Sequence, residues 1–137
     1  MEQVAPCLYI GGLDDAGDTE ALVTHNITAV LKLTHSDPET PYPEAVTVSD
    51  HPMFDGPRND FENFQAAVDR LTTFLKAGDT VLVHCSAGSS RSGAVAVAAL
   101  ARQENVSIDA ELARIQDQKS DVEPHPTLLK HARQVVR

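Results

Sequence analysis

A histidine and a cysteine stand side by side, followed by five small residues, an arginine and a serine. His84 and Cys85 begin this segment, Arg91 and Ser92 end it, and serines, an alanine and a glycine lie between them. Small residues let the backbone curl so that successive N–H groups point into one concavity, which binds anions. The guanidinium of Arg91 can hold two oxygens of a tetrahedral dianion. The segment therefore predicts an anion site with a thiol beside it.

The neighbouring elements favour an ionised thiol. Residues 80–84 predict a central strand, and the apolar run 94–101 predicts a buried helix beginning near Ser92. The start of a helix offers unpaired N–H groups and the positive end of the helix dipole. Such surroundings lower a cysteine pKa from about 8.5 to roughly 3.5–7.5. A Cys85 thiolate in an anion cradle indicates phosphoryl transfer to sulfur, which requires a nearby acid to protonate the leaving oxygen.

The rest of the chain supplies elements that can position this segment. Further strands are expected at residues 8–10, 27–33 and 45–48. Further helices are expected at 18–26 and 60–77, after a Ser107 cap with Ile108, Leu112 and Ile115 on one side, and after Pro126. This alternation predicts an α/β fold, with a mainly parallel central sheet of about four to five strands and helices on both faces. We expect one domain over residues 1–137. Ligands of such sheets bind beyond the carboxyl ends of strands, where the Cys85 segment lies.

Composition excludes several other classes of function. The 137 residues include 11 Lys and Arg against 20 Asp and Glu, a net charge of −9, which argues against nucleic-acid binding. The longest apolar run has eight residues, far fewer than the roughly 20 that cross a bilayer. Without a visible secretory signal, we expect a cytoplasmic monomer. The acidic excess leads to the hypothesis that the protein is adapted to a salty cytoplasm.

No pattern in the sequence indicates a metal or cofactor. The two cysteines, Cys7 and Cys85, are isolated, and the histidines lack the spacing of zinc ligands. We interpret Cys7 as a small apolar residue beside a strand. The spacing of Gly88 and Gly93 is that of a nucleotide-binding loop, but Ala94 stands where such a loop needs lysine.

The segment from His84 to Gly93 resembles the His-Cys, five residues, Arg-Ser/Thr signature of cysteine-dependent phosphatases. Its Ser-Arg-Ser ending is most similar to the dual-specificity protein phosphatases, and the resemblance extends over nearly the whole chain. It implies hydrolysis of phosphotyrosine, phosphoserine and phosphothreonine through a phosphocysteine intermediate, without metal or cofactor. By that resemblance, His84 orients the loop, Cys85 is the nucleophile, and Ser92 assists breakdown of the intermediate. The phosphate ligands are then Arg91 and the backbone amides of Ser86, Ala87, Gly88, Ser89, Ser90 and Arg91.

The general acid has more than one candidate. In the family that this chain resembles, the acid lies shortly before the helix that leads to the nucleophile's strand, and Asp55, nine residues before Phe64, fits that spacing. Asp50 follows the preceding strand more directly and is the alternative. Asp60 is a third candidate.

Two other functions stay open beside a phosphoprotein phosphatase. The first is a phosphatase that acts on small-molecule or lipid phosphates, although the signature loop lacks the lysines of phosphoinositide-directed relatives. The second is a phosphate-binding module without turnover, which the presence of Cys85, Arg91 and an acid candidate disfavours.

Overall fold

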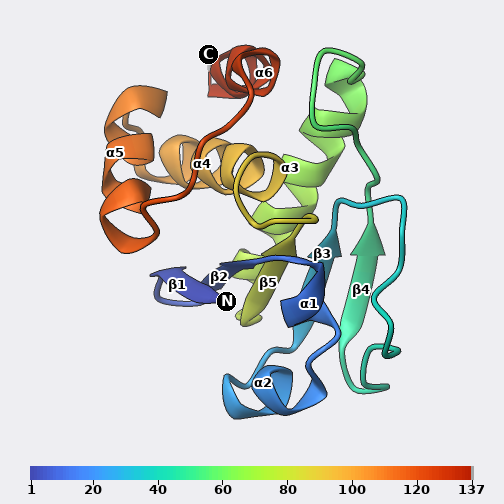
Figure 1. Ribbon diagram of the computed structural model, residues 1–137. Helices are drawn as coiled ribbons and strands as arrows, with labels where there is room; N and C mark the ends of the chain where they lie inside the picture. The colour runs from blue at the N-terminus through green and yellow to red at the C-terminus, as the bar shows by residue number, and fades with distance from the viewer. Residues whose placement is uncertain (137) are drawn as a thin grey trace.

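A five-stranded sheet lies between two groups of helices in the computed structural model, which describes residues 1–136 (Figure 1). The strands are β1 (Glu2–Ala5), β2 (Leu8–Gly11), β3 (Ala29–Lys32), β4 (Thr47–Asp50) and β5 (Val81–His84). Their order across the sheet is β1-β2-β5-β3-β4, and only the edge strand β1 runs antiparallel to its neighbour. The predicted α/β fold with a mainly parallel sheet is confirmed.

The helices cover both faces of the sheet. They are α1 (Leu13–Ala16), α2 (Thr19–Thr24), α3 (Phe61–Lys76), α4 (Arg91–Glu104), α5 (Ile108–Gln118) and α6 (Pro126–Val136). Side chains alternate between the faces of a strand, so Val30 and Leu82 pack with Leu22 of α2, while Leu31 and Val83 pack toward the group α3–α6. Strand β5 is thus buried on both faces, as its apolar sequence predicts.

Local capping fixes where several helices begin. The side chains of Asp18, Asp60 and Ser107 accept hydrogen bonds from backbone amides at the starts of α2, α3 and α5. Helix α4 is buried from Ser92 to Ala101 because α3, α5 and α6 pack around it. Small side chains in α4 permit this close packing. The packing holds the first turn of α4 next to the carboxyl end of β5.

The structure differs from the sequence predictions at the start and at one edge of the sheet. Strand β1 and helix α1 were not predicted, and β4 begins two residues later than the predicted strand 45–48. Cys7 lies in the turn directly before β2, beside a strand as the sequence predicts, and its side chain is exposed. Leu8 is level with Val81 in the sheet, which places Cys7 and Cys85 at opposite ends of adjacent strands. The two thiols therefore cannot pair without unfolding.

Candidate active site

The phosphate loop, residues 85–91, connects the carboxyl end of β5 to the first turn of α4. Gly88 has a φ of +72°, and a Cβ there would lie 2.7 Å from the backbone carbon of Gly11. The amide of Leu13 donates to the carbonyl of Ser86 at 3.0 Å, and that of Cys85 donates to the carbonyl of Gly11 at 3.3 Å. The turn between β2 and α1 therefore supports the curled backbone of the phosphate loop.

The Cys85 thiol is surrounded by hydrogen-bond donors. Its Sγ lies 3.1 Å from the Ser92 hydroxyl oxygen. Burial by itself would raise the pKa of Cys85, but the Ser92 hydroxyl and the backbone amides of Ser92, Gly88 and Ser89 outweigh it and lower that pKa below its ordinary value. The local structure thus favours the thiolate that the sequence predicts.

Arg91 has an unsatisfied buried donor beside the loop. Its Nη1 donates to the carbonyl of Met53 at 3.1 Å. Its Nε is buried and has no hydrogen-bond partner among residues 1–136. A buried N–H without a partner is costly unless a ligand completes it. Because a guanidinium is a cation, an anion is the kind of ligand that suits this donor.

His84 is held by a residue that the sequence analysis did not identify. The Tyr42 hydroxyl lies 2.7 Å from His84 Nε2, and His84 Nδ1 lies 3.4 Å from the carbonyl of Cys85. Burial, with the charges of Lys32 and Arg91, lowers the pKa of His84 to about 4 although the Cys85 carbonyl opposes this. The neutral ring therefore donates a hydrogen bond from Nδ1 to the Cys85 carbonyl and accepts one at Nε2 from the Tyr42 hydroxyl. These two hydrogen bonds connect the loop before β4 to the start of the phosphate loop.

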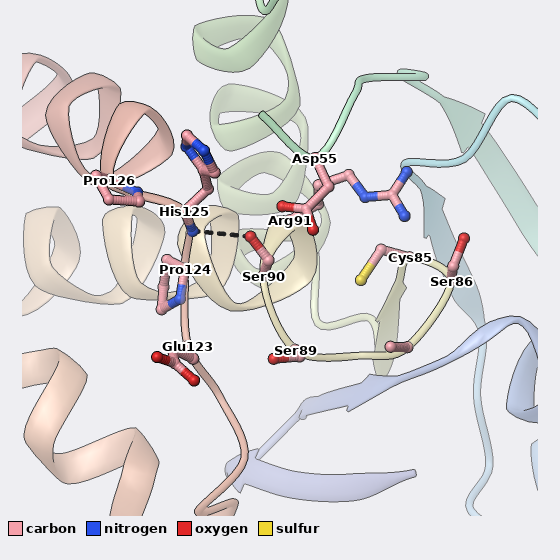
Figure 2. Close-up of a pocket in the computed structure, with 11 residues that line it drawn as sticks. Asp55, Cys85, Ser86, Ser89, Ser90, Arg91, Glu123, Pro124, His125 and Pro126 are labelled. Carbon is pink, nitrogen blue, oxygen red and sulfur yellow. Dashed lines mark hydrogen bonds between the residues drawn. The ribbon is translucent and has the colours of Figure 1, made fainter. Parts of the chain in front are cut away.

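The three acid candidates occupy different places. Asp55 lines the cavity of about 430 Å³ that also contains Cys85 and Arg91 (Figure 2). Asp50 lies at the end of β4 with its carboxylate 3.5 Å from Lys32 Nζ, and Asp60 accepts from the Glu62 amide at the start of α3. Of the three, only Asp55 is among the residues that line this cavity.

The opposite wall of the cavity comes from the segment before α6. Figure 2 shows Glu123, Pro124, His125 and Pro126 across from Cys85. The amide of His125 donates to the Ser90 hydroxyl at 2.8 Å, and the Ser89 hydroxyl donates to the carbonyl of Asp121 at 2.6 Å. Residues 121–126 thus support the phosphate loop.

Candidate metal ligands do not gather around this cavity or elsewhere in the described part of the chain. Within residues 1–136, no group of three or more His, Cys, Asp or Glu side chains is placed to hold a metal ion. No helix described by the structure is both long and apolar enough to cross a membrane.

The cavity brings together a thiol among backbone amides, an arginine and a carboxyl group, which is the kind of site that a cysteine-dependent phosphatase requires. Residues 8–136 match the family model for the dual specificity phosphatase catalytic domain. Mouse dual specificity phosphatase 28 is 32% identical over 124 residues, covering 90% of this chain and 76% of the relative. The human protein of the same name is 29% identical over 127 residues, covering 92% and 72%. This chain belongs to the dual specificity phosphatase family and is a cysteine-dependent hydrolase.

Solved structures show the same relationship. The crystal structure of human DUSP28 superposes with a TM-score of 0.87 at 25% identity, covering 99% of this chain and 95% of that one. A mouse putative dual specificity phosphatase complexed with zinc tungstate gives a TM-score of 0.88 at 29% identity, covering 98% and 84%. The resemblance stated from the signature is confirmed over the whole fold.

Proposed function

We propose that this phosphatase removes phosphate from proteins in two steps through a phosphocysteine on Cys85. The observation that carries the proposal is that Cys85, Arg91 and Asp55 line one cavity, where contacts lower the pKa of Cys85 and Arg91 has a buried Nε without a partner among residues 1–136. The nucleophile, the anion ligand and the proton donor that phosphoryl transfer requires are then all present.

In the first step, the Cys85 thiolate attacks phosphorus and forms an S–P bond. The ester P–O bond breaks, and protonated Asp55 gives its proton to the leaving oxygen. The amides of residues 86–91 and the Arg91 guanidinium hold the equatorial oxygens, where charge gathers in the transition state. Neutral His84 orients the loop through the Cys85 carbonyl.

In the second step, water attacks phosphorus and gives a proton to the Asp55 carboxylate. The S–P bond breaks, and inorganic phosphate leaves while the thiolate re-forms. The Ser92 hydroxyl, 3.1 Å from Sγ, donates to the sulfur as negative charge returns to it. Ser92 therefore assists breakdown of the intermediate, and the cycle needs no cofactor.

Substituting the candidate acids tests these roles. We expect Asp55→Asn to lower kcat/KM by about 10²-fold on a phosphate ester with a poor leaving group, because general acids contribute roughly 10²–10⁴-fold. Asp50→Asn should remain near the parent value, since Asp50 does not line the cavity. The opposite result would transfer the acid role to Asp50. A burst of aryl alcohol that is absent in Cys85→Ser would support the covalent intermediate.

Phosphorylated proteins are the proposed substrates. A chain of 137 residues leaves little sequence for insertions that would deepen the pocket, so we expect both long and short phosphorylated side chains to enter it. The net charge of −9 disfavours nucleic-acid ends. We expect Cys85→Ser to retain phosphoproteins from native lysate, whereas recovery of only small phosphorylated metabolites would favour the alternative substrate class. A single domain, a monomeric state and a cytoplasmic location stay predictions from the sequence.

A further inference from the structure

We infer that Asn59 is the positioning residue for the general acid, because its side chain holds the backbone on both sides of Asp55. The inference concerns the acid loop, residues 52–59, between β4 and α3. It rests on the proposed function, since Asn59 can act only through the proton transfer assigned to Asp55.

The Asp55 carboxylate has no anchor of its own. Its side chain is exposed, and within residues 1–136 it takes part in none of the hydrogen bonds or ion pairs that the structure shows. The conformation of the acid loop backbone must therefore determine where this carboxyl group lies relative to Cys85. Misplacement of a catalytic group by about 1 Å can cost about 10²-fold in rate.

Asn59 fixes that backbone through both ends of its carboxamide. The amide of Phe54 donates to Asn59 Oδ1 at 2.8 Å, while Asn59 Nδ2 donates to the Phe54 carbonyl at 2.5 Å and to the Gly56 carbonyl at 2.9 Å. These three contacts bracket Asp55 in the sequence. The arrangement needs an acceptor and a two-proton donor on one short side chain, which asparagine supplies and aspartate does not.

Asn59 is itself tied to the body of the protein. Its backbone carbonyl lies 3.2 Å from Nε2 of His131 on α6, and that imidazole packs against Phe61 and Phe64 with ring centroids 5.6 and 5.7 Å away. At the other end of the loop, Arg91 donates to the Met53 carbonyl. The acid loop is thus attached at one end to α6 and at the other to Arg91 of the phosphate loop, and Asn59 holds the backbone between them.

A series of aryl phosphates with leaving groups of increasing pKa tests the inference. Proton donation matters most for poor leaving groups, so we expect Asn59→Ala to lower kcat/KM about 10-fold to 100-fold for phenyl phosphate. For a dinitrophenyl phosphate, whose leaving group needs little protonation, the loss should be less than about threefold. An unchanged dependence on the leaving group in Asn59→Ala would overturn the inference.

A matched variant and a double variant separate positioning from general loosening. Asn63→Ala also removes a hydrogen bond to the loop, from Nδ2 to the Pro52 carbonyl at 2.9 Å, but leaves residues 54–56 untouched. We expect it to keep the parent dependence on the leaving group. In an Asp55→Asn background, Asn59→Ala should add less than about a twofold loss, because the two residues act on the same proton transfer. A full additional loss would identify a merely structural role and overturn the inference.

Two further outcomes are distinguishable. If Asn59→Ala does not fold, the isosteric Asn59→Asp replaces it, and the same loss with poor leaving groups is expected because its carboxylate faces two carbonyls. An unchanged leaving-group dependence in folded Asn59→Asp would overturn the inference. If Asp55→Asn leaves that dependence unaltered, the assignment of the acid fails, and the positioning role of Asn59 fails with it.

Discussion

The pKa of Cys85 depends on two opposing effects, burial and hydrogen bonding. A buried thiol in apolar surroundings is inert, since burial favours the neutral form. Here the Ser92 hydroxyl and three backbone amides reverse the direction and lower the pKa of Cys85. The amides belong to the backbone of the loop, whereas the Ser92 hydroxyl is a side-chain donor that Ser92→Ala removes without changing the backbone.

We therefore expect alkylation of Cys85 by iodoacetamide to report a pKa below that of an ordinary thiol, about 8.5. Ser92→Ala should raise the midpoint of the pH profile, because the thiolate loses its hydroxyl donor at 3.1 Å. Labelled Cys85 must be quantified by peptide mass spectrometry, since Cys7 is exposed and also reacts. A parent midpoint at or above pH 8.5 would contradict the proposed thiolate.

His84 makes stability depend on pH. In the unfolded chain its pKa is near 6.5, whereas in the folded protein burial lowers its pKa to about 4. As the pH falls through this window, the unfolded state binds a proton that the folded state does not, so the free energy of unfolding decreases. The full effect is about 3 kcal/mol.

Urea titrations from pH 7 to pH 4 can measure this decrease. His84→Gln should lack the component that the imidazole contributes, although it is less stable throughout because Tyr42 loses its acceptor. Carboxyl groups titrate in both proteins, so the difference between their slopes isolates His84. Parallel slopes would show that His84 is protonated equally in both states.

At the scale of elements, the contact between the turn after β2 and the phosphate loop decides whether the site forms. Gly88 has positive φ and its missing Cβ would collide with the backbone of Gly11, at 2.7 Å from its carbon and 2.9 Å from its oxygen. Backbone cannot move aside as a side chain can. The close approach, as well as the torsion, therefore requires glycine.

Gly78, at the end of α3, provides a matched control. It has a φ of +86°, but nothing lies within 4 Å of a Cβ built there. Both Gly78→Ala and Gly88→Ala incur backbone strain of about 1–2 kcal/mol. We expect only Gly88→Ala to lose activity, by more than about 10²-fold in kcat/KM, as the loop amides leave the positions that bind phosphate. Equal activities of the two folded variants would show that the close approach is unimportant.

The molecule as a whole carries an excess of acidic groups. With 20 Asp and Glu against 11 Lys and Arg, the net charge of −9 makes the folded state repel itself. Added salt shortens the Debye length from about 30 Å at 0.01 M to about 3 Å at 1 M and screens this repulsion. Individual surface ion pairs, such as Arg102 with Asp69, contribute little and weaken at the same time.

We therefore expect the thermal midpoint of unfolding to rise by several degrees between about 0.01 M and 1 M NaCl. Sodium chloride is preferable to sulfate, which strengthens hydrophobic burial by a separate effect. Circular dichroism at a fixed pH near 7 measures the shift. A midpoint that does not change with salt would count against adaptation to a salty cytoplasm.

The parts of the site that could be predicted from the sequence are formed by residues close together in the chain. Cys85, Arg91 and Ser92 fall within one strand-loop-helix unit, so their types and spacing already define the anion cradle. The central strands and the helices α2 to α6 also carry local signals: apolar periodicity, capping side chains and glycines. The fold class followed from these signals, and the family from the resemblance of residues 84–93 to the phosphatase signature.

Tertiary structure alone decided what depends on distant partners. Of the three carboxyl candidates, Asp55 lines the cavity of Cys85, whereas Asp50 and Asp60 are not among its lining residues. Tyr42 on His84, and residues 121–126 against the phosphate loop, join segments more than 30 residues apart. Edge strand β1 likewise forms by pairing with β2. Such contacts produce no periodic pattern in the sequence, because the two partners come together only when distant segments of the chain fold against each other.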